Sequence, residues 1–382
     1  MISFELSEEQ KALRDVARDF AKNEIIPKAA EYDKNATFPI DILKKAFEVG
    51  FLNQAVPESY GGGGLSNLDA VILNEELAYG CIGFSTSLMV NDLALSPILI
   101  AGNNAQKEKF FKMFTKEYTT GSFCLTEPNA GSDVAGLQTK AEKKGDYYIL
   151  NGTKTFITNG TYAKLYTVFA TLDPTQRHKA LCCFAVEKCD GITVSKKEDK
   201  MGQRCSDTVQ IVFNNVKVPQ ENLIGKEGEG WLIAMKTLDK SRPLVSAGSI
   251  GLARRAMECA RDYAKERVAF GKVIAEYEAI QFMLANMAKG VEAARLLAWK
   301  AAWLLDQKLP STHISSMAKC FGTDHAMQTT IDAVQIYGGY GYMKDYPVEK
   351  LMRDAKLLQI YEGTNQIQRL VIARELLKAN FY

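Results

Sequence analysis

Residues 145–160, GDYYILNGTKTFITNG, decide the fold class that the sequence predicts. Two Asn-Gly pairs, at 151–152 and 159–160, stand among β-branched and aromatic residues. Asn-Gly is the strongest short signal for a β-hairpin turn, because both residues tolerate a positive φ. Further short strand-like runs, with turn residues between them, follow as far as Pro219. Strands at this spacing predict a small antiparallel barrel or sandwich in the middle of the chain.

The segment before this region is predicted to be helical. Ser7 and Gln10 have the spacing of a capping box, and apolar residues follow at helical intervals. Residues 38–51 predict a short helix, and residues 66–80 predict another. The chain is therefore expected to begin with a helical domain.

The segment after this region is also predicted to be helical, in longer pieces. From about Gly228 apolar stripes recur at helical spacing, and Pro310 separates two of the helices. Thr364 is a suitable N-cap for the last helix. The expected fold class is α+β, with an N-terminal helical domain (1–119), a middle antiparallel β-barrel domain (120–227) and a C-terminal helical bundle domain (228–382).

Composition excludes some functional classes. The 382 residues suggest two or three domains, and 47% hydrophobic with 24% charged residues is typical of a soluble globular protein. A net charge of +2 without a Lys/Arg-rich run gives no support for nucleic-acid binding. We expect no apolar run long enough to span a bilayer. The N-terminus, MISFELSEEQKALRD, is charged almost at once and lacks the apolar core of a signal peptide, so a cytoplasmic location is expected.

The cysteines and histidines do not predict a metal site. The eight cysteines are expected to be thiols, since Cys182, Cys183 and Cys189 do not form a C-x-x-C pair and no histidine lies at a zinc-like offset. With three histidines in the chain, a His-centred triad or metal cluster is hard to build.

Two glycine runs have structural interpretations. GGGG at 61–64 lacks the Lys-Ser/Thr of a P-loop, so a flexible connection is favoured. In YGGYGY at 337–342, Gly338 or Gly339 is expected to be a left-handed helix cap, with a close cofactor approach as the alternative. No G-x-G-x-x-G stands between a strand and a helix, so a Rossmann nicotinamide site is not supported.

Residues 123–136, FCLTEPNAGSDVAG, lie where the helical pattern changes to the β pattern. Thr126, Ser132 and the N–H groups around Gly131 could donate several hydrogen bonds from one loop. A polar turn is the simpler interpretation, but ligand sites favour such boundaries between domains.

Glu362, in QIYEGTNQIQRL (359–370), is an acid just ahead of the last predicted helix. A solvated acid favoured by the helix dipole is one interpretation. The other is a general base, because burial beside Ile360 and Tyr361 would raise the pKa of this carboxyl toward neutrality. The pattern of residues favours the first interpretation.

Several long motifs, in order along essentially all 382 residues, resemble the FAD-dependent acyl-CoA dehydrogenase family and most closely its medium-chain type. They are FCLTEPNAGSDVAG (123–136), MGQRCSDTVQIVFNNVKVP (201–219) and YPVEKLMRDAKLLQIYEGT (346–364), together with QIYEGTNQIQRL (359–370). The resemblance implies an α–β–α subunit, one FAD per subunit, a homotetramer and a role in fatty acid β-oxidation.

The resemblance also implies a reaction, the oxidation of an acyl-CoA thioester to its trans-2-enoyl form. Glu362 would remove the α-proton while the β-hydrogen leaves as hydride to flavin N5. The backbone N–H of Glu362 and a ribityl hydroxyl would polarise the thioester carbonyl. Gly363 would let the backbone come close. Electrons would then pass to an electron-transferring flavoprotein.

Further contacts are implied residue by residue. Gln335, Gly338 and Gly339 would meet the FAD of a neighbouring subunit. The other expected cofactor-binding residues are Phe123, Leu125, Thr126, Gly131, Ser132, Phe156, Ile157, Thr158, Arg267, Phe270, Thr364 and Gln366. The expected substrate-binding residues are Ser132, Asp239, Arg242, Glu362 and Gly363.

Three acidic or hydroxyl residues bear on the roles that the resemblance implies. Glu278 stands where the family usually has glutamine, and a carboxylate would repel the FAD pyrophosphate, so Glu278 is not an expected contact. Ser241 occupies a segment where some relatives place their base and cannot act as one, which favours Glu362. Asp92 is expected to be a solvated or capping acid, and the alternative is that it reshapes the acyl pocket for a ring.

Three other functions remain open. A dehydrogenase of a cyclic acyl-CoA, such as cyclohexanecarboxyl-CoA, would use the same base. An acyl-CoA oxidase is less favoured, because those chains typically carry an added C-terminal domain. A non-catalytic helical assembly protein belongs to a different class, and the intact Glu362 and flavin loop argue against it.

Overall fold

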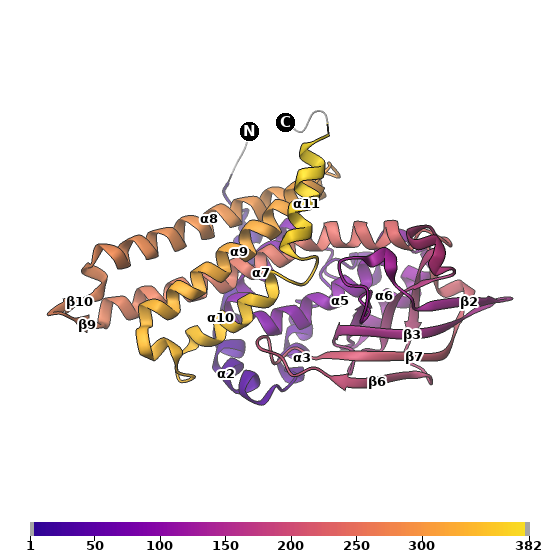
Figure 1. The fold of residues 1–382 in the computed structure, drawn as a ribbon, viewed down its shortest axis with the longest axis horizontal. Helices are drawn as coiled ribbons and strands as arrows, with labels where there is room; N and C mark the ends of the chain where they lie inside the picture. Colours follow the sequence, from indigo (N-terminus) through magenta and orange to yellow (C-terminus); the bar gives the residue numbers. More distant parts are fainter. Residues whose placement is uncertain (1–3, 379–382) are drawn as a thin grey trace.

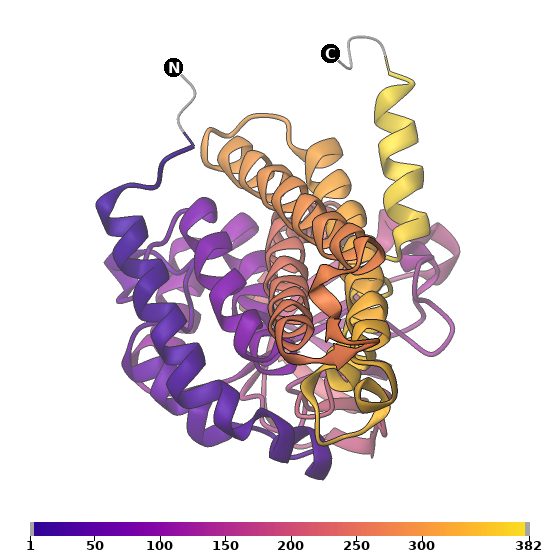
Figure 2. The ribbon, with the colours of Figure 1, turned by 90° about the vertical axis from the view of Figure 1, so that its left-hand side faces the viewer.

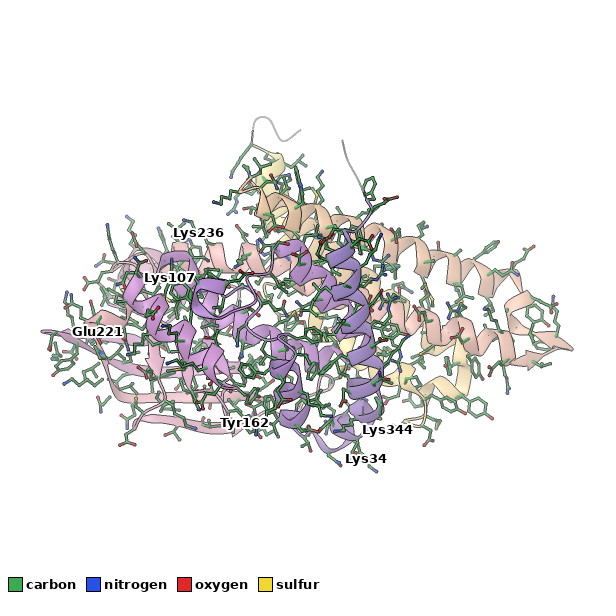
Figure 3. The ribbon with its side chains drawn as sticks, turned by 180° about the vertical axis from the view of Figure 1, so that it is seen from behind. Lys34, Lys107, Tyr162, Glu221, Lys236 and Lys344 are labelled. Atoms are coloured by element: carbon green, nitrogen blue, oxygen red, sulfur yellow. The ribbon has the colours of Figure 1, made fainter. Side chains whose placement is uncertain are left out.

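The computed structural model describes residues 4–378, in which helical segments enclose one sheet-forming segment (Figure 1). This arrangement confirms the predicted order of helices, strands and helices. The N-terminal helices are α1 (Glu8–Phe20), α2 (Ile26–Asn35), α3 (Ile40–Glu48), α4 (Asn67–Gly80), α5 (Ile82–Ala101) and α6 (Asn104–Lys116), with a π-helical turn at Ala21–Ile25. Figure 3 shows these helices from behind, with Lys34 and Lys107 on their outer side.

Capping side chains decide where several of these helices begin. Ser7 Oγ accepts a hydrogen bond from Gln10 N at 3.2 Å, and Gln10 Oε1 accepts one from Ser7 N at 3.1 Å. The predicted capping box is therefore confirmed. Ser66 Oγ accepts from Asp69 N at 3.1 Å and starts α4 in the same way.

The middle segment forms an open, mixed sheet, so the predicted closed antiparallel barrel is wrong. The strands run in the order β6-β7-β3-β2-β4-β5-β8, and β1 lies parallel to β4 beside this path. Within residues 4–378 the outer strands β6 and β8 do not pair with each other, so the sheet is not closed. The strands are β1 (Gly121–Cys124), β2 (Lys140–Lys144), β3 (Tyr147–Thr158), β4 (Leu165–Thr171), β5 (Leu181–Glu187), β6 (Ile192–Lys197), β7 (Thr208–Pro219) and β8 (Leu223–Ile224).

Neither Asn-Gly pair forms the predicted hairpin turn. Residues 151–152 lie inside β3 at a register shift against β7, and a Cβ on Gly152 would lie 2.4 Å from Thr139 Oγ1. Residues 159–160 follow β3 and begin a turn toward β4, which pairs with β1, β2 and β5. The two-residue turn is instead at 145–146, between the paired strands β2 and β3. Long-range pairing has therefore overridden the local turn preference.

The C-terminal segment is a bundle of long helices. Its elements are α7 (Gly230–Glu266), β9 (Val268–Ala269), β10 (Lys272–Val273), α8 (Glu278–Asp306), α9 (Thr312–Tyr337), α10 (Pro347–Leu358) and α11 (Asn365–Leu376). Pro310 separates α8 from α9, and Thr364 caps α11, as predicted. The α7 helix runs from the sheet to the β9–β10 hairpin at the far tip (Figure 1). The last helix, α11, projects away from the other bundle helices (Figure 2).

The two glycine runs have different surroundings. A Cβ on Gly62 would lie 2.2 Å from the carbonyl oxygen of Val56, so this position requires glycine, whereas Gly61, Gly63 and Gly64 are exposed. Gly338 follows α9 with φ 59° and ψ −138°, which is outside the left-handed helical region. Gly338 is therefore not the predicted left-handed cap. It ends α9 in a different backbone conformation, one that glycine adopts readily.

The α5 helix is long and apolar enough to cross a membrane, although no such run was expected from the sequence. It is 20 residues long with a mean hydropathy of 1.4, which is enough by length and composition alone to cross a membrane. However, 72% of an 18-residue apolar stretch of this helix is buried inside the protein. The buried residues of α5 pack against α4, α7 and β1, as those of a core helix do.

Close packing between α4 and α7 gives a first prediction. A Cβ on Gly251 would lie 2.1 Å from the carbonyl oxygen of Glu75 and 2.8 Å from Tyr79 N, so the two backbones would have to separate. Gly251→Ala is expected to destabilise the protein by about 1–3 kcal/mol, measured by urea unfolding.

The control is Gly248→Ala, one turn earlier in α7. Its new Cβ would meet the end of the flexible Ile82 side chain, at 2.7 Å, and would cost less. Equal losses in both variants would contradict a backbone collision at Gly251.

Candidate active site

A cavity of about 540 Å³ lies where α5, α7, the loops of the sheet and the turn before α11 meet. It brings together predicted residues that are far apart in the sequence. Those that line it are Phe123, Leu125, Thr126, Gly131, Ser132, Phe156, Ile157, Thr158, Asp239, Arg242, Glu362 and Gly363. Apolar side chains of α5, which sequence reasoning did not identify, also contribute: Met89, Val90 and Leu93. Its volume is suited to a small-molecule ligand.

Glu362 faces this cavity from the turn between α10 and α11. Its φ of 55° lies in the left-handed region, and Gly363 follows with φ 87°. Ser241 Oγ, on α7, donates a hydrogen bond to Glu362 Oε2 at 2.6 Å. Two consecutive residues with positive φ turn the carboxylate toward α7, and a Cβ on Gly363 would lie 2.7 Å from Gln368 Nε2. The interpretation as a solvated acid at a helix start is therefore wrong.

The surroundings of Glu362 make it a stronger base than an ordinary carboxylate. Burial raises the pKa of Glu362, and the hydrogen bond from Ser241 and the charges of Arg242 and Lys319 oppose this increase. The expected apolar wall is only partly right, because Ile360 is 50% exposed. Tyr361 does line the cavity beside Glu362, so the predicted wall is present on that side.

Arg242, which is buried, and Asp239, which is partly exposed, form a charged pair on the α7 wall. The guanidinium of Arg242 donates to Asp239 Oδ1 and to Ser316 Oγ, the latter at 3.2 Å, and Thr312 Oγ1 donates to Asp239 Oδ2 at 2.8 Å. In the described residues, Arg242 Nε is buried without a hydrogen-bond partner. A buried donor of this kind would be satisfied by an acceptor group of a bound molecule.

The loop from Phe123 to Ser132 is held by a buried ion pair that sequence reasoning missed. Lys154 Nζ donates to the carbonyl oxygen of Leu125 at 3.0 Å and to Glu127 Oε1 at 2.8 Å. Lys154 has 0% exposure, and Glu127 also accepts from the backbone of Thr139 at 2.9 Å. Only tertiary structure pairs these two charges, which stand 27 residues apart.

The end of β3 forms the wall beside this loop. Thr155 N donates to the carbonyl oxygen of Thr126 at 2.9 Å, so the loop and the strand are joined through their backbones. Phe156 adopts φ 57° and is 64% exposed, so that its ring is available at the edge of the cavity. A positive φ in an aromatic residue is an uncommon conformation and is often associated with function.

Asp92 on α5 is neither solvated nor a helix cap. It is 5% exposed and lines the cavity, and its Oδ1 accepts from Ala55 N at 2.8 Å. Burial raises the pKa of Asp92, while the backbone N–H of Ala55 and the charge of Lys240 oppose the increase. Lys240 lines the same cavity, and burial lowers its pKa. The α5 helix therefore presents a polar group to the cavity among apolar neighbours, and the favoured prediction for Asp92 is wrong.

Other predicted cofactor residues lie away from the cavity. Arg267 follows α7, and at 1.5 Å per residue it lies about 37 Å along the helix from Arg242. The Arg267 guanidinium lies over the Tyr340 ring, 5.5 Å from its centroid, and so it adjoins Gly338 and Gly339. The exposed predicted residues of this far tip are Arg267, Phe270, Gln335, Gly338 and Gly339. Phe270 is 97% exposed, with φ 50°.

Three further residues near the helix starts also lie outside the cavity lining. Thr364 Oγ1 accepts from Ile367 N at 3.3 Å and caps α11, and Gln366 is exposed on that helix. Glu278, which replaces the expected glutamine, is exposed at the start of α8.

The cysteines are thiols, as predicted. All eight cysteines are free. Among residues 4–378, no group of three or more His, Cys, Asp and Glu side chains is arranged to hold a metal ion.

Known proteins were compared with this chain and its fold. A medium-chain specific acyl-CoA dehydrogenase assigned as probable in Caenorhabditis briggsae is 44% identical over 380 residues, which are 98% of this chain and 92% of that protein. The solved butyryl-CoA dehydrogenase from Megasphaera elsdenii is 41% identical with a TM-score of 0.96, covering 99% of this chain and 100% of that one. A chain in a solved structure of the electron transferring flavoprotein of Acidaminococcus fermentans is 44% identical, also with a TM-score of 0.96, covering 99% and 100%.

Family models match nearly the whole chain. The acyl-CoA dehydrogenase N-terminal domain matches residues 7–117, the middle domain matches 122–216, and the C-terminal domain matches 228–377. The chain therefore belongs to the acyl-CoA dehydrogenase family.

Proposed function

We propose that this enzyme removes two hydrogens from a short- or medium-chain acyl-CoA thioester and produces the trans-2-enoyl-CoA, with Glu362 as the base. The observation that carries this proposal is the position of Glu362. Its carboxylate lies in the cavity, is made more basic by burial and is oriented by Ser241 at 2.6 Å. A base for an α-proton must be aimed and partly desolvated, and Glu362 meets both requirements.

FAD is the cofactor. Bound FAD supplies the two-electron acceptor that takes the β-hydrogen as hydride. The residues present fit a flat, polar ring system, because Phe156 offers an aromatic face while Thr126, Ser132 and Thr158 offer hydroxyl groups in the same wall. The Lys154–Glu127 ion pair would keep this loop in shape when the cofactor binds.

On the substrate side, the chain holds the thioester and receives the α-proton. Glu362 accepts this proton on its carboxylate, and the backbone N–H of Glu362 polarises the thioester carbonyl as negative charge develops there. Gly363 keeps the approach free of a side chain. Arg242, whose Nε lacks a partner among the described residues, would meet an acceptor group of CoA, with Asp239 fixing its position.

The exposed tip of α7 supports a homotetramer. Arg267, Phe270 and Gly338 do not line the cavity of their own subunit, yet the resemblance makes them FAD contacts. A neighbouring copy would bring its tip to the cofactor, which explains why an aromatic ring as exposed as Phe270 is retained at the surface.

An electron-transferring flavoprotein is the proposed electron acceptor. Support comes from the similar chain found in a solved structure of such a flavoprotein from Acidaminococcus fermentans. Membership of an enzyme family stands against a non-catalytic helical assembly protein.

A cyclic acyl-CoA is a second candidate substrate, and Asp92 is compatible with it. A buried carboxylate in the wall makes this part of the cavity unfavourable for a long apolar chain. A short chain or a compact ring would avoid that contact.

Substitution of Glu362 tests its role as the base. Glu362→Gln keeps the size and a hydrogen-bond acceptor for Ser241 but has no basic carboxylate. We expect unchanged FAD content and enoyl-CoA affinity, with the rate of flavin reduction lowered at least about 100-fold, measured by stopped-flow absorbance.

The matched control is Glu375→Gln, on α11 but outside the residues that line the cavity. It should reduce its flavin at the wild-type rate. A Glu362→Gln variant with near-normal flavin reduction would overturn the proposed role of Glu362.

Removal of the Ser241 hydroxyl gives a pH-dependent prediction. This hydroxyl lowers the pKa of Glu362, so Ser241→Ala should raise that pKa, and the base will be protonated at a higher pH. The acidic limb of the pH–rate profile should therefore move to higher pH, with a smaller change at the optimum.

The control is Ser246→Ala, on the same helix as Ser241. It removes the bond from Ser246 Oγ to the carbonyl oxygen of Ala318 on α9, and it should not move the limb. A limb that moves to lower pH in Ser241→Ala would be incompatible with the geometry at Glu362.

A reductive titration of the bound flavin tests the substrate class. Acyl-CoAs of graded chain length, together with cyclohexanecarboxyl-CoA, are added without oxygen, and bleaching of the flavin band is followed. Short or medium linear thioesters are expected to bleach it most efficiently. Selective bleaching by the cyclic thioester would favour the second candidate, and no bleaching by any thioester would exclude both.

A further inference from the structure

Lys319, on α9, is a buried cation that the proposed reaction does not yet use. Its side chain has 0% exposure. Its Nζ donates to the carbonyl oxygen of Gly363 at 2.8 Å and to Asn365 Oδ1 at 2.8 Å. Both acceptors flank the turn that carries Glu362, so the ammonium joins α9 to that turn.

The turn needs such support, because its backbone is strained. Glu362 has φ 55°, a left-handed conformation that is unfavourable for a residue with a Cβ. Gln368 Nε2 also donates to the carbonyl oxygens of Glu362 and Gly363, at 3.2 and 3.0 Å, but it belongs to α11, the helix that the turn begins. Lys319 instead fixes the turn relative to α9, a separate helix of the bundle.

Asn365 extends this attachment. Its Nδ2 donates to Thr323 Oγ1 at 2.9 Å and to Asp324 Oδ1 at 2.7 Å, and both acceptors lie on α9. The start of α11 is thus held on α9 through one amide and one ammonium. Without the ammonium, the carbonyl oxygen of Gly363 would lose its only bond from α9 among the described contacts.

The charges around Glu362 and Lys319 are coupled. Burial lowers the pKa of Lys319 to about 7, and Glu362 opposes this decrease. Arg242, from α7, acts on both groups, and Cys320 and Asp324 act on Lys319 from α9. The helix α11 contributes Arg374, which acts on Arg242. Lys319 and Arg242 are thus the cations that favour the ionised form of Glu362.

We propose that Lys319 is a positioning residue for the reaction. Its buried ammonium clamps the Glu362–Gly363 turn to α9 and supplies positive charge behind the Glu362 carboxylate. The carboxylate therefore stays ionised and aimed although it is withdrawn from water. This inference rests on the proposed role of Glu362 as the base.

A purely structural lysine would behave differently. It would contribute to the free energy of unfolding but would leave the titration of Glu362 unchanged. The test therefore follows the Glu362 carboxyl band directly, by difference infrared spectroscopy of the FAD-loaded, ¹³C-glutamate-labelled enzyme at a series of pH values. The band is assigned by its loss in Glu362→Gln.

Two neutral variants separate charge from packing. Lys319→Met removes the charge and both hydrogen bonds, whereas Lys319→Gln removes the charge and keeps a donor. Each is expected to raise the midpoint of the Glu362 titration by about one pH unit, because a nearby positive charge is lost. Lys319→Met should also slow flavin reduction at the pH optimum about tenfold, with enoyl-CoA affinity unchanged. Lys319→Arg, which keeps the charge, should return the midpoint of the Glu362 titration most of the way to its wild-type pH.

The control is Lys350→Met, which removes another buried lysine, one that pairs with Asp354 on α10 at 2.6 Å. It should lower stability without moving the Glu362 band. An unmoved titration in Lys319→Met or Lys319→Gln would overturn the proposal. Because the titration needs no turnover, its result is independent of whether Glu362→Gln confirms the base.

Discussion

The proposed reaction depends on keeping one carboxylate, that of Glu362, partly out of water without pairing it completely with a cation. Complete solvation would leave Glu362 an ordinary weak base, and a direct ion pair would make it weaker still. Glu362 instead receives a hydroxyl hydrogen bond from Ser241 and the more distant charges of Arg242 and Lys319. Its carboxylate is therefore ionisable and oriented, and its pKa remains raised.

This balance requires several helices to keep fixed positions relative to one another. Ser241 and Arg242 come from α7, Lys319 comes from α9, and Glu362 comes from the turn before α11. Close packing keeps the two long helices together, since a Cβ on Gly322 of α9 would lie 2.7 Å from Ser249 Oγ of α7. A small displacement between these helices would change the distances on which the proposed reaction depends.

Much of the fold was predictable because its signals are local. Ser7, Pro310 and Thr364 act on the residues beside them, and the structure confirms all three. The wrong predictions concern partners far away in the sequence. Residues 151–152 pair within β3 instead of turning, and the buried Asp92 carboxylate accepts from Ala55 N, 37 residues away. Turn propensity cannot reveal which strand or side chain will occupy the other side.

For the candidate site, too, local signals were predictable and contacts between distant segments were not. By itself, the sequence determined the helical, sheet-forming and helical order, and its motifs placed the loop at 123–136 and Glu362 in a known family. Only the tertiary structure decided which groups surround Glu362, because Ser241 and Lys319 stand 121 and 43 residues before it in the chain. Desolvation and charge depend on distance in space, and helix packing alone sets that distance.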